Sequence, residues 1–272
     1  MDLGLKDRVY VVTGGSRGLG NASARALVAE GAKVVVSGRD ERTVLAAAAE
    51  LGPDAVGVAV DNADPDGPER LLAAARAHFG RVDGVLISVG GPPPGSAADN
   101  TDEQWRTAFE SVFLGAVRLA RAAVAALGDE GNEGNEGNEG NEANRGNGSD
   151  GGVVGFVLSG SVHEPIPGLT ISNGLRPGLA GFAKSLADEV GPRGIRVVGL
   201  LPARIDTDRV RELDALTGDA DTAREGNESR IPLRRYGTPE EFGRVAAFVL
   251  SPAASYLTGI MLPVDGGALR GF

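Results

Sequence analysis

The segment Thr13–Gly20 carries the residues whose types and spacing point most directly to chemistry. It reads Thr-Gly-Gly-Ser-Arg-Gly-Leu-Gly, and Gly14, Gly18 and Gly20 let the backbone turn sharply and approach a ligand without an intervening Cβ. The segment follows a strand-like run, residues 8–12, and opens a helix-like run. A helix that begins at such a turn directs free N–H groups and the positive end of its dipole into it. The segment therefore predicts a pyrophosphate site and, with it, dinucleotide binding.

The elements that would position this turn alternate along almost the whole chain. Short apolar runs typical of strands are separated by Ala-rich runs typical of helices, and this order predicts a parallel sheet with helices on both faces. Right-handed crossovers favour a Rossmann-type doubly wound topology, so we predict a single α/β domain over residues 1–272 with about seven strands. The strand-like runs are 9–13, 33–37, 56–60, 85–88, 153–158, 196–201 and 261–264, and the helical runs lie near 21–30, 41–51, 67–79, 101–127, 172–191 and 239–250.

Two regions depart from this alternation. Residues 128–152 repeat Gly-Asn-Glu and have no apolar face, so we expect a flexible low-complexity insertion at the surface, with an acidic docking loop as the alternative. Residues 206–231 are polar and irregular and follow the sixth strand. A doubly wound sheet binds its ligands at the carboxyl ends of the strands. We therefore predict that residues 206–231 form a substrate lid; the alternative is an ordinary surface loop.

Composition narrows the classes of function. The 272 residues carry a net charge of −10, which argues against nucleic acid or an anionic membrane as a partner. Cysteine is absent, so the chain offers no disulfide and no thiolate metal site, and we predict no metal centre. No run approaches the roughly 20 apolar residues of a membrane span, and the run at 9–12 is too short for a signal peptide. A cytoplasmic location is the expectation.

Further features follow the glycine turn in order along the chain: Asp61, Gly90, Ser159, Pro202, Thr207, residues 237–241, Thr258-Gly259 and residues 264–267. Together with the turn they resemble the short-chain dehydrogenase/reductase family, and this many features at suitable spacing is stronger evidence than a lone glycine motif. The resemblance implies a nicotinamide cofactor and a small-molecule carbonyl or alcohol as substrate. It also implies a homodimer or homotetramer, since members of the family usually associate.

The end of the second strand bears on which nicotinamide cofactor is bound. Family members that prefer NAD usually have an acid near position 38, where this chain has Gly38, so no carboxylate is present to repel a 2′-phosphate. Arg17 and Arg39 offer guanidinium groups instead, which suit phosphate through paired, charge-assisted hydrogen bonds. We therefore favour NADP(H) over NAD(H); the alternative is that both arginines are solvated surface charges.

The resemblance also assigns cofactor contacts to other positions. Asp61 and Asn62 would lie beside the adenine, although both residue types also favour strand-end turns. The predicted cofactor-binding residues are Gly14, Ser16, Arg17, Gly18, Leu19, Gly20, Arg39, Asp61, Asn62, Gly90, Arg176, Pro202 and Thr207.

The catalytic positions depart from the family pattern. The family uses a Tyr as acid/base, a Lys four residues later, a Ser and an Asn, and only the Ser is retained here, as Ser159. The Tyr position falls on Ser172, the Lys position on Arg176 and the Asn position on Val112. A Ser hydroxyl is a poorer acid than Tyr, and Arg presents a rigid fork where Lys presents a point charge. Residues 172–176 resemble a divergent branch of the family in which Ser-Asn-x-x-Arg replaces Tyr-x-x-x-Lys.

His163 is a candidate proton donor. It lies four residues after Ser159, in a loop on the ligand side of the predicted sheet. Imidazole groups ordinarily titrate near neutrality and so suit proton transfer. The alternative is that His163 is an exposed, idle loop residue. The predicted catalytic residues are thus Ser159, Ser172, Arg176 and His163.

Three functions are compatible with these residues. The first is an NADP(H)-dependent oxidoreductase with an altered catalytic site, for which reduction of 3-oxoacyl-carrier-protein is one candidate activity. The glycine turn and Ser159 favour this function. The second is a catalytically inactive NADP-binding sensor or partner subunit, favoured by the joint loss of Tyr, Lys and Asn. The third is a structural role in an assembly with an active relative. We rank the oxidoreductase first.

Overall fold

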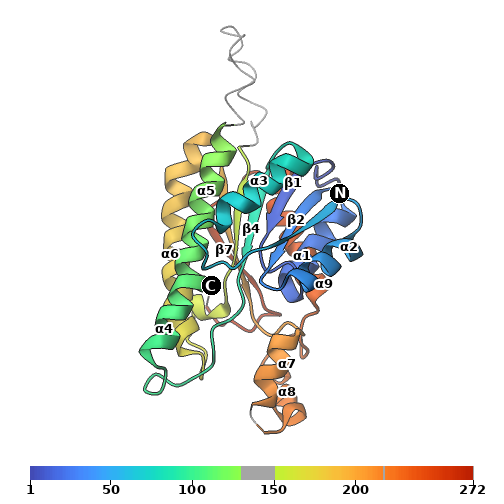
Figure 1. The fold of residues 1–272 in the computed structure, drawn as a ribbon. Coiled ribbons are helices and arrows are strands. Elements are labelled where there is room, and N and C mark those ends of the chain that lie inside the picture. The colour runs from blue at the N-terminus through green and yellow to red at the C-terminus, as the bar shows by residue number, and fades with distance from the viewer. Residues whose placement is uncertain (130–150, 217, 272) are drawn as a thin grey trace, which may run out of the picture.

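The computed structural model describes residues 1–129, 151–216 and 218–271. Its sheet has seven parallel strands in the order β3-β2-β1-β4-β5-β6-β7, which confirms the predicted Rossmann-type sheet (Figure 1). The predicted insertion at 128–152 lies outside the described residues, apart from 128, 129, 151 and 152. The strands are β1 (Val9–Val12), β2 (Lys33–Gly38), β3 (Ala55–Ala59), β4 (Gly84–Ser88), β5 (Val153–Val157), β6 (Arg196–Pro202) and β7 (Ile260–Val264).

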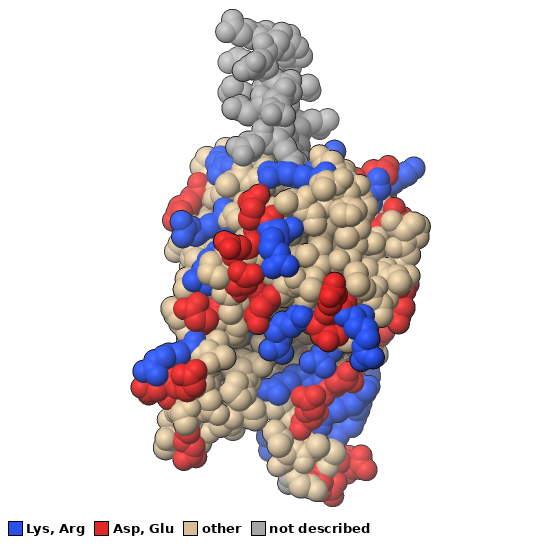
Figure 2. Space-filling model, viewed as in Figure 1, with Lys and Arg blue, Asp and Glu red and all other residues tan. Residues whose placement is uncertain are grey.

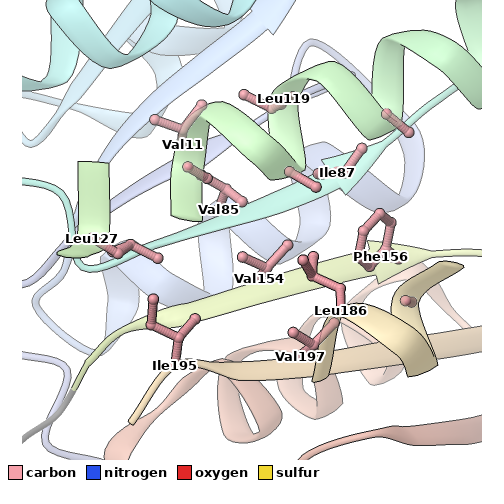
Figure 3. Packing of buried hydrophobic residues seen from close by; sticks show 14 of the residues in the cluster. Val11, Val85, Ile87, Leu119, Leu127, Val154, Phe156, Leu186, Ile195 and Val197 are labelled. Atoms are coloured by element: carbon pink, nitrogen blue, oxygen red, sulfur yellow. The ribbon is translucent and has the colours of Figure 1, made fainter. Parts of the chain in front are cut away.

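Helices cover both faces of the sheet, as expected for strands that are apolar on both sides. Figure 3 shows one of the two cores, in which Val85 and Val154 of the sheet lie close to Leu119 and Leu186 of the covering helices. The helices on this face are α3 (Gly67–Phe79), α5 (Gly115–Asp129) and α6 (Thr170–Val190), and those on the other face are α1 (Gly18–Ala29), α2 (Glu41–Leu51) and α9 (Pro239–Leu250).

The direction of winding reverses between β1 and β4. β1 pairs with β2 on one side and with β4 on the other. At the carboxyl end of β1, the Thr13 hydroxyl donates to the Ser88 carbonyl at 3.0 Å and accepts from the Ser88 N–H at 2.9 Å, which ties the ends of the two strands together. Ligands of doubly wound sheets bind at this reversal. The glycine bend begins directly after Thr13 and therefore lies there.

Residues 206–231 contain two helices, so the prediction that this region is irregular was wrong. The helices are α7 (Asp208–Ala215) and α8 (Ala220–Glu228), which form a hairpin that projects beyond the carboxyl ends of the strands (Figure 1). Thr207 and Asp219 cap them through side-chain oxygens that accept backbone N–H groups. Because both helices are short and polar, apolar periodicity could not reveal them, whereas the capping residues could have done so.

The helical run predicted at 101–127 changes type along its length. It consists of α4 (Asp102–Ala108), a π-helical segment η1 (Phe109–Leu114) and then α5. Each helix in the described part of the chain lacks the length or the apolar character that a membrane crossing requires.

Candidate functional site

The glycine bend after β1 is too tight for a side chain at Gly14 or Gly20, but it has open space beside Gly18. Gly14 has a φ of 58°, and a Cβ there would lie 2.5 Å from the Ser88 carbonyl oxygen. A Cβ on Gly20 would collide with the Gly14 carbonyl. Gly18 also has a φ of 58°, but a Cβ there would meet only Thr207 Cγ2, at 4.0 Å. The space beside Gly18 can therefore hold a ligand.

The first turn of α1 leaves its N–H groups without a capping side chain. Arg17 occupies the N-cap position in an extended conformation and makes no side-chain capping bond. Asp40, Thr101 and Thr238, by contrast, cap α2, α4 and α9 with side-chain oxygens. Uncapped N–H groups and the helix dipole together favour an anion at this end. The start of α1 fits a pyrophosphate.

Two arginines beside the bend have no acidic partner. Arg17 and Arg39 are exposed, and neither side chain forms an ion pair or hydrogen bond within the described residues. Nearby Arg25, in contrast, pairs with Glu50 at 2.7 Å. Ser16 lies close to the end of β2, since a Cβ on Gly38, the residue before Arg39, would be 2.9 Å from Ser16 Oγ. The two guanidinium groups therefore remain available for a phosphate.

The predicted adenine contacts lie at the end of β3. Asp61 Oδ1 accepts the Ala63 N–H at 3.0 Å, so this side chain also stabilises a strand-end turn. The backbone of Asn62 packs so closely on Gly115 that no Cβ would fit there. A small hollow is lined in part by Asp61, Asn62 and Pro68. Adenine binding at this hollow stays a prediction.

The remaining predicted cofactor residues lie at or just after strand ends and at the starts of α1 and α7. Gly90, in the loop after β4, is exposed, and no atom lies within 4 Å of where its Cβ would be. Leu19 is partly buried against the core on the α1 face. Pro202 ends β6, and Thr207 faces Gly18 from the start of α7. The structure thus places Thr207 at the glycine bend, while the Asp61 hollow lies at the end of β3.

Ser159 and Ser172 are connected through a third serine. Ser159 lies just beyond β5, and its Oγ accepts the Ser161 N–H at 3.1 Å. Ser161 Oγ and Ser172 Oγ, from the turn and from α6, are 3.4 Å apart. Ser161 and Ser172 are buried, whereas Ser159 is partly exposed. The Ser172 and Ser161 hydroxyls thus pair, and the Ser161 amide joins them to the more exposed Ser159 hydroxyl; we call these three residues the serine row.

Arg176, one turn after Ser172 on α6, is a buried cation. Its Nη1 donates to the Val157 carbonyl at 2.7 Å and its Nη2 to the Val89 carbonyl at 3.1 Å, while its buried Nε has no partner. No acidic side chain in the described parts of the chain pairs with it. Burial lowers the pKa of Arg176 to about 10, so the guanidinium remains charged at neutral pH. This charge favours negative charge that develops nearby. Binding of Arg176 to the cofactor ribose stays a prediction.

The position that the family resemblance assigns to an Asn is apolar in this fold. Val112 lies in η1 and is buried in a cluster with Ala108, Ile171 and Leu175. Since Ile171 and Leu175 flank Ser172 along α6, the cluster excludes polar groups from that side of the helix. Val112 therefore offers no polar group that could hold the water of a proton relay.

His163 is exposed at the end of the turn η3 (Gly160–Val162). Its ring makes no hydrogen bond within the described residues, so the structure does not bring it into the serine row. A role as proton donor therefore stays a prediction.

Asn173 has a structural role that we did not assign from the sequence. Its Oδ1 accepts the Ile166 N–H at 3.0 Å, and its Nδ2 donates to the Ile166 carbonyl at 2.9 Å. This paired contact fixes the loop between Ser161 and α6. The Asn of Ser-Asn-x-x-Arg thus helps to position the serines on either side of that loop.

A polar network that the sequence analysis also missed holds the base of the α7–α8 hairpin. The buried Asp214 carboxylate accepts hydrogen bonds from Arg204 at 3.0 Å and from the Tyr236 hydroxyl at 2.9 Å. Arg224 lies over the Tyr236 ring, 4.5 Å from its centroid. Burial raises the pKa of Tyr236, so its hydroxyl stays protonated as the donor to Asp214. Figure 2 shows basic and acidic side chains close together at the base of this projection.

One further contact joins the hairpin to the loop after β4. Arg209 of α7 donates from Nη2 to the Pro92 carbonyl at 2.7 Å. This bond and the approach of Thr207 to Gly18 place the start of α7 over the glycine bend. That residues 206–231 act as a substrate lid stays a prediction.

The sheet and its uncapped glycine bend define an α/β protein of the dinucleotide-binding Rossmann class. Residues 8–138 match the family model described as short chain dehydrogenase, and residues 142–268 match the model described as Enoyl-(Acyl carrier protein) reductase. A relative in Escherichia coli (strain K12), the 3-oxoacyl-[acyl-carrier-protein] reductase FabG, is 31% identical over 97% of this chain and 98% of its own length. The chain belongs to the short-chain dehydrogenase/reductase family of oxidoreductases.

Two solved structures show the same fold. L-sorbose reductase from Gluconobacter frateurii, solved with NADPH and L-sorbose, has a TM-score of 0.88, 29% identity and full coverage of both chains, 100% each. A 3-ketoacyl-(acyl-carrier-protein) reductase from Brucella melitensis, solved with NADH, has a TM-score of 0.82 and 28% identity, and the match covers 97% of this chain and 99% of that one.

Proposed function

We propose that this protein is an NADP(H)-dependent reductase of small carbonyl compounds in which Ser159 is the retained family serine and Ser172 and Arg176 occupy the positions of the usual Tyr and Lys. The observation that carries the proposal is the buried Arg176 charge, without an acidic partner, beside the serine row. The relatives named for reduction of 3-oxoacyl groups and L-sorbose support a carbonyl substrate. A 3-oxoacyl thioester and a ketose are therefore the first substrates to test.

The residues around the glycine bend fit the cofactor. The uncapped N–H groups of α1 would hold the pyrophosphate, and Thr207 would approach it from the opposite side. Arg17 and Arg39 would bind the 2′-phosphate that distinguishes NADP(H) from NAD(H). When bound, the nicotinamide supplies the hydride for the reduction. No acidic side chain at position 38 opposes the phosphate.

The chain's own groups would stabilise the oxygen of the substrate. Ser159, the more exposed end of the row, donates a hydrogen bond to the carbonyl oxygen, and Ser172 supports it through Ser161. As negative charge develops on that oxygen, the positive charge of the buried Arg176 stabilises it. The proton that completes the alcohol comes from His163 or from water reaching Ser159.

Replacing Arg39 with Ala tests the choice of cofactor. Charge-assisted hydrogen bonds contribute about 1.5–3 kcal/mol each, so we expect the Kd for NADPH to rise roughly 10–100-fold. The Kd for NADH should change less than threefold, roughly, because NADH lacks the phosphate. Fluorescence titration of both cofactors measures the difference, with Arg121→Ala as a control for loss of one exposed positive charge. Equal weakening of both cofactors would contradict a phosphate-binding role for Arg39.

Consumption of NADPH in the presence of carbonyl substrates tests the reaction itself. We expect turnover with at least one 3-oxoacyl thioester or ketose, and loss of turnover when Ser159 is changed to Ala. Tight NADPH binding without turnover on any substrate would instead support a non-catalytic sensor or partner subunit, as the loss of Tyr and Lys allows.

A further inference from the structure

The C-terminal segment, residues 265–270, lies against the loop that follows Ser159. A Cβ on Gly160 would be 3.8 Å from Leu269 Cδ2, so the leucine side chain faces a residue that has no side chain of its own. The next amide, that of Arg270, donates to Glu164 Oε1 at 3.2 Å. The segment is therefore fixed to the turn that carries the serine row.

The same segment contacts the base of the α7–α8 hairpin. The Leu233 N–H donates to the Gly266 carbonyl at 3.3 Å. The Arg270 guanidinium donates from Nη2 to the Arg230 carbonyl at 3.2 Å. Residues 265–270 thus bridge two parts of the chain that flank the substrate position in the proposed function.

The segment's conformation is fixed by its own residues. The two carboxylate oxygens of Asp265 accept the N–H groups of Gly267 and Leu269, each at 2.8 Å. Gly266 and Gly267 have φ values of 66° and 87°, which glycine adopts without strain. The turn therefore holds Leu269 at a defined place before any substrate binds.

We propose that Leu269 forms an apolar wall of the substrate pocket beside Ser159 and limits the size of the carbonyl substituent, and that Glu164 is a positioning residue that holds this wall. The inference rests on the proposed function, because it takes Ser159 as the group that binds the carbonyl. The partly buried leucine opposite Gly160 favours an apolar substituent over a polar one. Because its Cδ2 lies only 3.8 Å from where a Cβ on Gly160 would be, the leucine would leave limited room for a longer chain.

Replacing Leu269 with Ala tests the wall with a series of straight-chain ketones of increasing length. One methylene in an apolar pocket changes specificity roughly 10–200-fold, so we expect kcat/KM for long ketones relative to short ones to rise at least about tenfold. The Kd for NADPH should stay unchanged. Leu45→Ala, at an exposed leucine of α2 outside the predicted lid, is the matched control and should leave the ratio as it is. An unchanged ratio in Leu269→Ala would overturn the assignment.

Two substitutions at Glu164 test the coupling without requiring turnover. Glu164→Gln keeps an oxygen that accepts the Arg270 N–H, whereas Glu164→Ala removes it. We expect hydrogen exchange of residues 266–271 to be faster in Glu164→Ala and to match the unsubstituted protein in Glu164→Gln. The chain-length ratio should shift in Glu164→Ala alone. Exchange that is equal in all three proteins, or equally fast in both variants, would overturn the positioning role.

The two readouts separate failure of this inference from failure of the proposed function. If the unsubstituted protein reduces no carbonyl, the proposed function fails and the pocket-wall assignment fails with it, while hydrogen exchange still decides whether Glu164 fixes residues 265–270. If it reduces carbonyls but Leu269→Ala leaves the chain-length ratio unchanged, only the wall assignment fails.

Discussion

Gly18→Asp should raise the Kd for NADPH about 10²–10³-fold, and it should destabilise the free protein less than Gly18→Asn does, although both side chains are strained at a φ of 58°. Gly18 is the first residue of α1, and its open side faces Thr207 across the proposed pyrophosphate position. A carboxylate about 4 Å from a phosphate charge near a protein surface costs about 4 kcal/mol before screening by salt. The same carboxylate stabilises the start of a helix through the dipole. Titration with NADPH and thermal unfolding without it measure the two effects.

Gly18→Asn is the matched control, because Asn has nearly the size of Asp but no charge. Both residue types tolerate the left-handed conformation that Gly18 adopts, with a φ of 58°. Gly18→Asn should therefore weaken NADPH binding only about tenfold, because its side chain keeps the cofactor away from the backbone and strains the bend locally. Equal Kd values for the two variants would show that no anion binds at this bend. A fall in the unfolding temperature of Gly18→Asp alone would show that the geometry assigned to α1 is wrong.

Ser159→Ala should lower kcat about 10²–10³-fold, the usual effect of removing one donor to a developing oxyanion. Ser172→Ala should lower kcat about tenfold, because its hydroxyl acts through Ser161, 3.4 Å away, rather than on the substrate. The two effects should be less than multiplicative, since the hydroxyls form one row. Steady-state kinetics on the best carbonyl substrate measures both variants and the double variant.

The control for the serine variants is Ser185→Ala, at an exposed serine of α6 whose hydroxyl donates to the Gly181 carbonyl. It should leave kcat unchanged. Because Ser159 also caps the turn η3, thermal unfolding is needed to show that Ser159→Ala remains folded. A folded Ser159→Ala with unaltered kcat would remove the serine row from the reaction.

The sheet and the glycine bend could be predicted because each depends on local sequence. The buried strands are continuous Val-rich runs, and the positive φ of Gly14 and Gly18 requires the residue type that the sequence supplies. The family could be inferred for the same reason, since its features lie in order along the chain. Strand ends differed from the expected ends by a residue or so, as backbone pairing rather than composition decides them.

The contacts within the site could not be predicted, because they join residues far apart in sequence. Arg176 matched a Lys position, but only the structure shows that its guanidinium binds the Val157 and Val89 carbonyls. The network of Asp214 and Tyr236 likewise depends on how the hairpin folds back. The hairpin itself was missed because its helices are stabilised by capping and polar contacts rather than by an apolar face.

Transfer of deuterium from NADPH labelled at nicotinamide C4 to a carbonyl substrate tests the central claim most directly. Mass spectrometry of the alcohol product would locate the label. We expect deuterium on the carbinol carbon in the unsubstituted protein, and a much slower appearance of labelled alcohol in Ser159→Ala. NADPH binding with no labelled alcohol from any 3-oxoacyl thioester, ketose or simple ketone would contradict the account.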